Sequence, residues 1–165
     1  MISDQWVLTA AHCVVDDRKG DVVRVSVELG QHQRNTDAII EALLPLAQVK
    51  IHPDYRSPRG SSNDLALLKL DDPVDFNNVP DVRPVCLPSD RDERFTGLRV
   101  TVAGWGRTAP NEGSSNVPLE TEVNVISDST CKETYGSRIS DDMICTISPR
   151  DGAVFQGSCK GDSGY

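Results

Sequence analysis

The sequence lacks several features that would point to particular classes of protein. No uninterrupted apolar run reaches the length of about 18 residues that a membrane-spanning helix needs, so we expect no membrane partner. Positive charge is scarce, because 17 Lys and Arg stand against 25 Asp and Glu, for a formal net charge of −8. Nucleic-acid-binding surfaces cluster Lys and Arg, so this balance argues against a nucleic-acid partner. There is also no internal repeat and no low-complexity tract.

The start of the chain lacks the features of a secretory signal peptide, since Met1–Asp4 has neither a basic group nor a continuous apolar stretch. Five cysteines in a strand-rich pattern nevertheless indicate an oxidising compartment. We reconcile the two observations by expecting the chain to begin inside a longer secreted, extracellular protein. Five is an odd number, so at least one thiol has no partner within the chain.

Ligand patterns for metals are also missing. No Cys-x-x-Cys spacing supports a zinc or redox role for the cysteines. His12, His32 and His52 fall at intervals of 20 residues, which is not a local ligand spacing. We therefore expect no metal and no cofactor, and we interpret His32 and His52 as loop residues.

What is present indicates one globular domain built mainly from strands. A length of 165 residues with 38% hydrophobic and 25% charged residues is typical of a domain with its own core. Alternation of apolar and polar residues, or a short apolar run, predicts strands. The predicted strands are Gln5–Thr9, Val23–Leu29, Ala38–Leu46 with Val49–Ile51, Leu65–Leu70, Leu98–Ala103 and Leu119–Ile126. Ser127–Tyr135 is predicted to be a short helix capped by Ser127 or Asp128.

Near its end the chain holds a serine between glycines, Gly161-Asp162-Ser163-Gly164. Glycine allows unusual backbone angles, so main-chain N–H groups can approach a reacting carbonyl and stabilise an oxyanion. A serine is a weak nucleophile unless a base lies beside it. Candidates for a base and for a carboxylate that orients it are His12, after Ala10-Ala11, and Asp64, before the apolar strand Leu65–Leu70.

Five motifs together resemble the chymotrypsin/trypsin-like serine protease family (peptidase S1). They are Trp6-Val7-Leu8-Thr9-Ala10-Ala11-His12-Cys13, Asn63-Asp64-Leu65-Ala66-Leu67-Leu68, Arg83-Pro84-Val85-Cys86-Leu87-Pro88, Ala103-Gly104-Trp105-Gly106 and Cys159-Lys160-Gly161-Asp162-Ser163-Gly164. The order His, Asp, Ser separates this family from other hydrolases with the same three groups. The resemblance spans essentially the whole chain.

The resemblance implies an all-β fold of two six-stranded antiparallel β-barrels. We expect 1–89 to hold most of the first barrel and the connection, and 90–165 the first part of the second. It also implies strands before Trp6 and after Tyr165, so we expect a partial peptidase S1 domain, incomplete at both ends. As an isolated chain it is expected to fold poorly and to show little activity.

Roles are implied residue by residue for a serine endopeptidase. Ser163 is the nucleophile, His12 the general base and Asp64 the residue that orients His12. The N–H groups of Gly161 and Ser163 form the oxyanion hole. Asp162 pairs with the ammonium freed when such a zymogen is activated. Without that ammonium we expect its carboxylate to be unpaired.

The resemblance further places Gly157, Ser158 and Lys160 at the substrate pocket. An uncharged base at Gly157 argues against simple trypsin specificity and fits elastase-like or chymotrypsin-like choices. Lys160 is more simply a solvated surface lysine.

Cysteine pairing is implied in the same way. Cys131 pairs with Cys145, while Cys13 and Cys159 find partners beyond the chain ends. Cys86 tethers an upstream chain by a disulfide. Implied partners are protein or peptide substrates and protease inhibitors. Two alternatives stay open, namely a catalytically silent homologue or fragment that binds within a cascade, and a fragment that is either non-functional or part of an active enzyme.

Overall fold

The computed structural model describes residues 1–16, 22–23, 25–34, 46–55, 62–79, 81–90, 92–109, 111–149, 157–158 and 160–163. Its elements, in chain order, are β1 (Trp6–Thr9), η1 (Ala11–Cys13), β2 (Leu46–Ile51), β3 (Ala66–Leu70), β4 (Arg99–Gly104), β5 (Leu119–Val125), α1 (Asp128–Tyr135), η2 (Gly136–Arg138) and β6 (Thr146–Ile147). They form two compact units, Met1–Leu87 with Ser163–Tyr165, and Pro88–Asp162.

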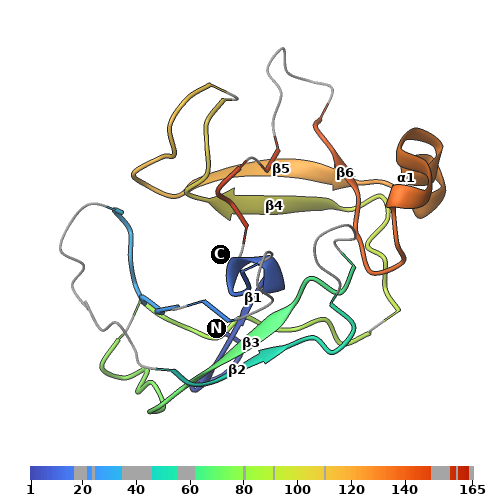
Figure 1. Ribbon diagram of the computed structural model, residues 1–165. Helices are drawn as coiled ribbons and strands as arrows, with labels where there is room; N and C mark the ends of the chain where they lie inside the picture. The colour runs from blue at the N-terminus through green and yellow to red at the C-terminus, as the bar shows by residue number, and fades with distance from the viewer. Residues whose placement is uncertain are drawn as a thin grey trace. The chain divides into compact units, whose positions relative to one another are not determined.

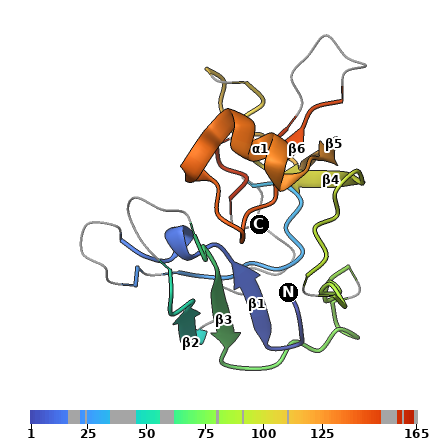
Figure 2. The same cartoon turned by 90° about the vertical axis from the view of Figure 1, so that its right-hand side faces the viewer.

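The first unit is built on a three-stranded antiparallel sheet in the order β1-β3-β2 (Figures 1 and 2). The central strand β3 alternates buried and half-buried residues along its whole length. Its inward residue Leu68 lies opposite Val7 of β1 and Val49 of β2. The predicted strands at Gln5–Thr9 and Leu65–Leu70 are therefore confirmed, although each begins one residue later, since Gln5 lies outside β1 and Leu65, which is 49% exposed, lies outside β3.

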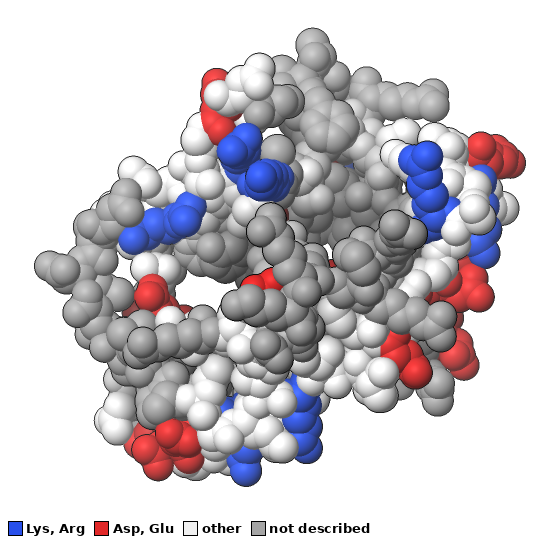
Figure 3. All heavy atoms as spheres, in the orientation of Figure 1, with Lys and Arg blue, Asp and Glu red and all other residues white. Residues whose placement is uncertain are grey.

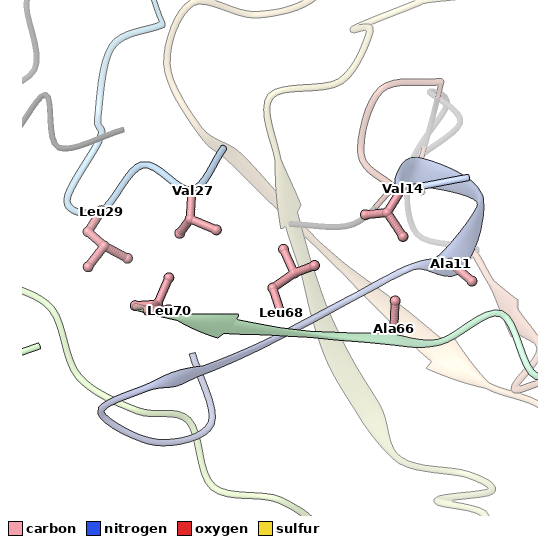
Figure 4. Close-up of a cluster of buried hydrophobic side chains, with 7 residues drawn as sticks. All are labelled: Ala11, Val14, Val27, Leu29, Ala66, Leu68 and Leu70. Atoms are coloured by element: carbon pink, nitrogen blue, oxygen red, sulfur yellow. The ribbon is translucent and has the colours of Figure 1, made fainter. Parts of the chain in front are cut away.

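The core of this unit covers the inner face of β3. Figure 4 shows the side chains of Ala66, Leu68 and Leu70 on one side of the strand, facing the residues that pack on it. The buried cluster comprises Ala11, Val14, Val27, Leu29, Ala66, Leu68 and Leu70. Burial of apolar surface contributes roughly 25 cal/mol per Å², so this cluster stabilises the packing of β3 against the segments that hold Val14 and Val27.

One strand prediction in this unit is wrong. The segment Val23–Leu29 forms no named strand among its described residues. Its alternation is real from Val25 onward, since Val27 and Leu29 are buried and Ser26 and Glu28 are exposed. Val23, however, is 38% exposed. Val27 makes a β-bridge, so the segment uses the period of two to bury side chains against β3 without forming a named strand among its described residues.

Some predictions fall on residues outside the described ranges. Of the predicted strand Ala38–Leu46, only Leu46 is described, and it begins β2 together with the predicted Val49–Ile51. Cys159 also lies outside the described residues.

The second unit holds a three-stranded antiparallel sheet in the order β4-β5-β6. The predicted strands at Leu98–Ala103 and Leu119–Ile126 are confirmed as β4 and β5, but Leu98, which is 51% exposed, lies outside β4 and Ile126 lies outside β5. The predicted helix is confirmed as α1. Its N-cap is Ser127, whose hydroxyl accepts a hydrogen bond from the backbone N–H of Thr130.

A disulfide between Cys131 of α1 and Cys145 fastens the helix to the start of β6, and it confirms the predicted pairing. The fold class is also confirmed, because the described residues are mostly strand with little helix, arranged as two antiparallel sheets. Neither sheet closes into a barrel among the described residues. None of the described helices has the length and apolarity needed to cross a membrane.

Candidate active site

The pairing of β1 with β3 brings His12 and Asp64 together. Thr9 at the end of β1 lies opposite Ala66 at the start of β3. His12 follows Thr9 by three residues, on η1, and Asp64 precedes Ala66 by two. Because the strands are antiparallel, both side chains emerge at the same end of the sheet. Ala11 is fully buried beneath this turn, which explains why a small residue precedes His12.

The Asp64 carboxylate makes two contacts with the same residue. Its Oδ1 accepts a hydrogen bond from the backbone N–H of His12 at 2.9 Å, and its Oδ2 lies 2.6 Å from the ring nitrogen Nδ1. The side chains are 43% exposed for His12 and 23% for Asp64. An ionised carboxylate only accepts hydrogen bonds, so Nδ1 must carry the proton in this contact. The neutral ring then has its lone pair at Nε2, where a base needs it.

Backbone geometry just before Asp64 aims the carboxylate. Asn63 has φ of 54°, in the left-handed region, and the N–H of Leu65 donates to the carbonyl oxygen of Asn63 at 2.7 Å. Asparagine tolerates this region better than most residues. The tight turn lets the chain enter β3 with the Asp64 side chain directed at His12.

Ser163 belongs to the same unit as His12 and Asp64. Its carbonyl oxygen accepts a hydrogen bond from the thiol of Cys13 at 3.6 Å, and the same sulfur lies 3.5 Å from Nε2 of His12. Burial, followed by the charge of Asp64, raises the pKa of the Cys13 thiol above its ordinary value. Cys13 therefore stays a neutral thiol between the ring and the backbone of Ser163. Ser163 itself is exposed.

In the second unit, the carboxylate of Asp162 lies against the turn at the end of β4. Its Oδ1 accepts a hydrogen bond from the N–H of Gly106 at 2.7 Å. The prediction of an unpaired Asp162 is therefore wrong. A Cβ placed on Gly104 or on Gly106 would lie 2.3 or 2.4 Å from that oxygen, so the two glycines leave the space that the carboxylate fills.

Gly161, the predicted oxyanion-hole residue, has φ of 103°, which favours glycine. A Cβ there would lie 3.3 Å from the Cα of Gly106. The loop before Ser163 is thus packed closely on the Gly104–Gly106 turn, and backbone hydrogen bonding reinforces this contact, since Arg107 N–H donates to the carbonyl of Lys160 at 3.0 Å.

A cavity of about 310 Å³ opens in the second unit beside Asp162. It is lined by Val102, Ala103, Gly104, Gly106, Arg107, Thr108, Leu119, Glu120, Thr121, Gly157 and Asp162. Of the three predicted substrate-pocket residues, Gly157 lines this cavity, whereas Ser158 and Lys160 do not line it and are exposed.

The contact between His12 and Asp64 and the glycine-containing loop before Ser163 are features of serine hydrolases, and comparison with known proteins identifies the family. A family model described as Trypsin matches residues 1–164, and the chain belongs to this family of serine proteases. Among solved structures the chain is similar to neuropsin, a serine protease expressed in the limbic system of mouse brain. The two share 30% sequence identity with a TM-score of 0.77, and the match covers 99% of this chain and 67% of the neuropsin chain.

Sequence reasoning missed three contributors to this arrangement. Asn63 and Gly106 entered the sequence analysis only as members of family motifs, and Cys13 was interpreted only as half of a disulfide. The Asn-Asp pair signals a left-handed turn, and the Gly-Trp-Gly spacing signals a close approach of another group. The contact of the Cys13 thiol with Ser163 could not be predicted from the local sequence, because the two residues are 150 positions apart.

Proposed function

We propose that the protein is a serine endopeptidase in which His12, Asp64 and Ser163 act as the catalytic triad. The observation that carries this proposal is the double contact of Asp64 with His12, through the backbone N–H at 2.9 Å and through Nδ1 at 2.6 Å. Membership of the trypsin family supports the same assignment.

The reaction follows from the roles of these groups. Ser163 Oγ attacks the carbonyl carbon of a peptide bond while Nε2 of His12 takes the hydroxyl proton. The C=O electron pair moves onto oxygen, and the N–H groups of Gly161 and Ser163 stabilise this oxyanion. The tetrahedral intermediate expels the amine, which receives the proton from His12. Water, deprotonated by His12, then attacks the acyl-enzyme and releases the carboxylate product and free Ser163.

Specificity and location extend the proposal. Gly157 brings no charge to the pocket base, so small or uncharged apolar side chains are the proposed choice at the cleaved residue. Protein substrates and protease inhibitors are the proposed partners. The Cys131–Cys145 disulfide supports an extracellular location for the zymogen. Cys86 is an exposed free thiol and is the proposed link to an upstream chain.

A fluorophosphonate probe tests the nucleophile in the full-length, activated protein. We expect covalent labelling that is lost in Ser163→Ala and retained in Ser26→Ala, which removes an exposed serine of the same unit. Asp64→Asn should slow labelling greatly, because the family's established triad chemistry loses about 10⁴ in kcat with this change. If the folded wild type is not labelled, the protein is a silent homologue that binds without cutting.

A further inference from the structure

Among the described residues, charge does not single out a binding face outside the candidate active site. Lys and Arg side chains are interspersed with Asp and Glu side chains on the face that Figure 3 shows. A feature that connects with the site lies instead directly after β2, in the turn 52–55. The turn begins at His52, a histidine to which the triad chemistry gives no role.

The turn 52–55 is closed by two hydrogen bonds that both end on His52. The N–H of Tyr55 donates to the carbonyl oxygen of His52 at 3.0 Å, and the N–H of Asp54 donates to the ring nitrogen Nδ1 of His52 at 3.1 Å. Pro53 favours this bend, because its ring presets φ for the second position of a turn. A ring nitrogen that accepts a hydrogen bond carries no proton, so the His52 ring is neutral in this arrangement, with its proton on Nε2.

Strand pairing and core packing fix the turn 52–55 beside the start of β3. Ile51, at the end of β2, lies opposite Ala66. The N–H of His52 continues this pairing by donating to the carbonyl oxygen of Leu65 at 2.9 Å. Ile51 and Tyr55, which flank the turn, both pack against the buried cluster of the first unit. His52 is therefore anchored next to the residues that lead into β3.

The turn 52–55 also contacts the residue that directs Asp64. The carbonyl oxygen of Asp54 accepts a hydrogen bond from Nδ2 of Asn63 at 3.4 Å. Asn63 holds its left-handed φ of 54° directly before Asp64, whose carboxylate contacts the backbone N–H and the Nδ1 of His12. All of these residues belong to the first unit. The contacts therefore run without a break from the His52 ring to the His12–Asp64 pair.

We propose that His52 is a positioning residue for Asp64. Its neutral ring closes the turn 52–55, and the turn holds Asn63 in the conformation that aims the carboxylate at His12. Without the Nδ1 acceptor, the N–H of Asp54 loses its partner and turns toward water, which draws the Asp54 carbonyl away from Asn63. This inference rests on the proposed triad and adds a residue that touches neither the substrate nor the reacting atoms.

The rate of fluorophosphonate labelling measures the effect of His52 on the site. The full-length, activated protein is used at about pH 8, where histidine side chains are mostly neutral. His52→Leu removes the acceptor and should slow labelling by about tenfold or more, since misplacing a catalytic group costs rate steeply. His52→Asn should stay within about twofold of the wild type, because an asparagine oxygen accepts a hydrogen bond from the N–H two residues on.

Two further variants control this comparison. Asp54→Ala removes a side chain from the same turn but keeps the backbone N–H and carbonyl that make both contacts, so labelling should stay within about twofold of the wild type. His52→Ser supplies a hydroxyl that accepts the same hydrogen bond more weakly, so its rate should lie between those of His52→Leu and His52→Asn. It also provides the comparison if His52→Leu does not fold in urea unfolding experiments.

A second measurement follows the His12–Asp64 contact itself and does not depend on catalysis. The proton on Nδ1 of His12, in the 2.6 Å contact with Asp64, should give a strongly downfield proton NMR resonance, as short charge-assisted hydrogen bonds do. It is recorded in full-length protein that carries Ser163→Ala. We expect the resonance to persist when Asp54→Ala or His52→Asn is added, and to be broadened or lost when His52→Leu is added.

Three results would overturn the proposal. If His52→Leu and His52→Ser change stability but neither the labelling rate nor the resonance, His52 only supports the fold. Equal losses in His52→Leu and His52→Asn would show that the Nδ1 acceptor is not what matters. Absence of the resonance even with His52 in place would mean that there is no ordered contact to position. A folded wild type that is not labelled, but whose resonance depends on His52, contradicts the proposed function and leaves the positioning role intact.

Discussion

A single backbone angle, at Asn63, decides where the Asp64 carboxylate points. Asn63 has φ of 54°, which costs a residue with a Cβ roughly 1–2 kcal/mol and is worst for β-branched residues. We expect Asn63→Val to lower the free energy of unfolding by about that amount, measured with urea and circular dichroism. It should also slow fluorophosphonate labelling, since Asp64 would leave His12.

Asn63→Gly is the control for this change. Both variants lose the hydrogen bond from Asn63 Nδ2 to the carbonyl of Asp54, at 3.4 Å, but glycine adopts the left-handed region without strain. The difference between the two variants therefore isolates the backbone term. Equal stability and equal labelling would show that the turn does not position Asp64.

Gly106 offers a second test at one residue. A Cβ at this position would lie 2.4 Å from Asp162 Oδ1, so Gly106→Ala must displace the carboxylate and break the 2.7 Å bond to the backbone N–H. We expect a loss of about 1–3 kcal/mol in urea unfolding, typical of overpacking. Gly113→Ala is the matched control, because no atom lies within 4 Å of its added Cβ. If both alanines cost the same, the packing of Asp162 against this turn is not what requires glycine.

Among the elements, α1 is held at its N-terminus by a charged contact from outside the helix. Arg94 donates to Asp128 Oδ1 at 2.8 Å and to the carbonyl of Met143 at 2.7 Å. The hydrogen bond from Arg94 lowers the pKa of Asp128 below its ordinary value of 3.8. A lowered folded-state pKa gives stability above the ordinary value and loses it as the pH falls.

We therefore expect Asp128→Asn to be less stable than the wild type at pH 7, with a difference that shrinks as the pH falls from about 4 toward 2. Glu133→Gln removes the same charge from the exposed side of α1 and should show no such pH-dependent difference. Urea titrations at each pH measure both variants. A constant difference for Asp128→Asn would show that the Arg94 contact carries none of the pH dependence.

The local sequence predicted the helix and strands whose residues show a clear period or a capping residue. Alternation predicted β4 and β5, and the Ser-Asp start predicted α1, where only Ser127 proved to be the cap. The period of two at Val25–Leu29 predicted which side chains are buried but not how far the backbone pairs beyond the bridge at Val27, because a ladder needs a partner strand in register. The ends at Leu65 and Leu98 were overextended, since apolar residues continue past the last paired position.

The candidate site likewise combines features that local sequence predicts with features that depend on tertiary contacts. The motifs predicted that His12 and Asp64 act together, and strand pairing explains why the two side chains meet. The partner of Asp162 could not be predicted, because it is a backbone N–H 56 residues away whose availability depends on Gly106 lacking a side chain. A backbone N–H donor cannot be recognised from the sequence, except where a glycine leaves the N–H group accessible.

At the scale of the whole molecule, the disulfide lies entirely within the second unit. Cys131 and Cys145 are 14 residues apart, and closing such a loop stabilises by about 3 kcal/mol in the chain-entropy model. We expect Cys131→Ala/Cys145→Ala to speed amide hydrogen exchange in β4, β5 and α1. Exchange in β1, β2 and β3 should stay unchanged, because two compact units with separate cores open separately.

Cys86→Ala serves as the control, since it removes an exposed free thiol from the first unit and should leave exchange unchanged throughout. The exchange rates in the two units decide which contacts of the candidate residues depend on the disulfide. His12 and Asp64 both belong to the first unit, whereas Gly161 and Asp162 belong to the second. If exchange rises only in the second unit, the His12–Asp64 contact survives loss of the disulfide, whereas the packing of Gly161 and Asp162 on the Gly104–Gly106 turn does not. If β1 and β3 exchange faster as well, loss of the disulfide also destabilises the first unit, which holds His12 and Asp64.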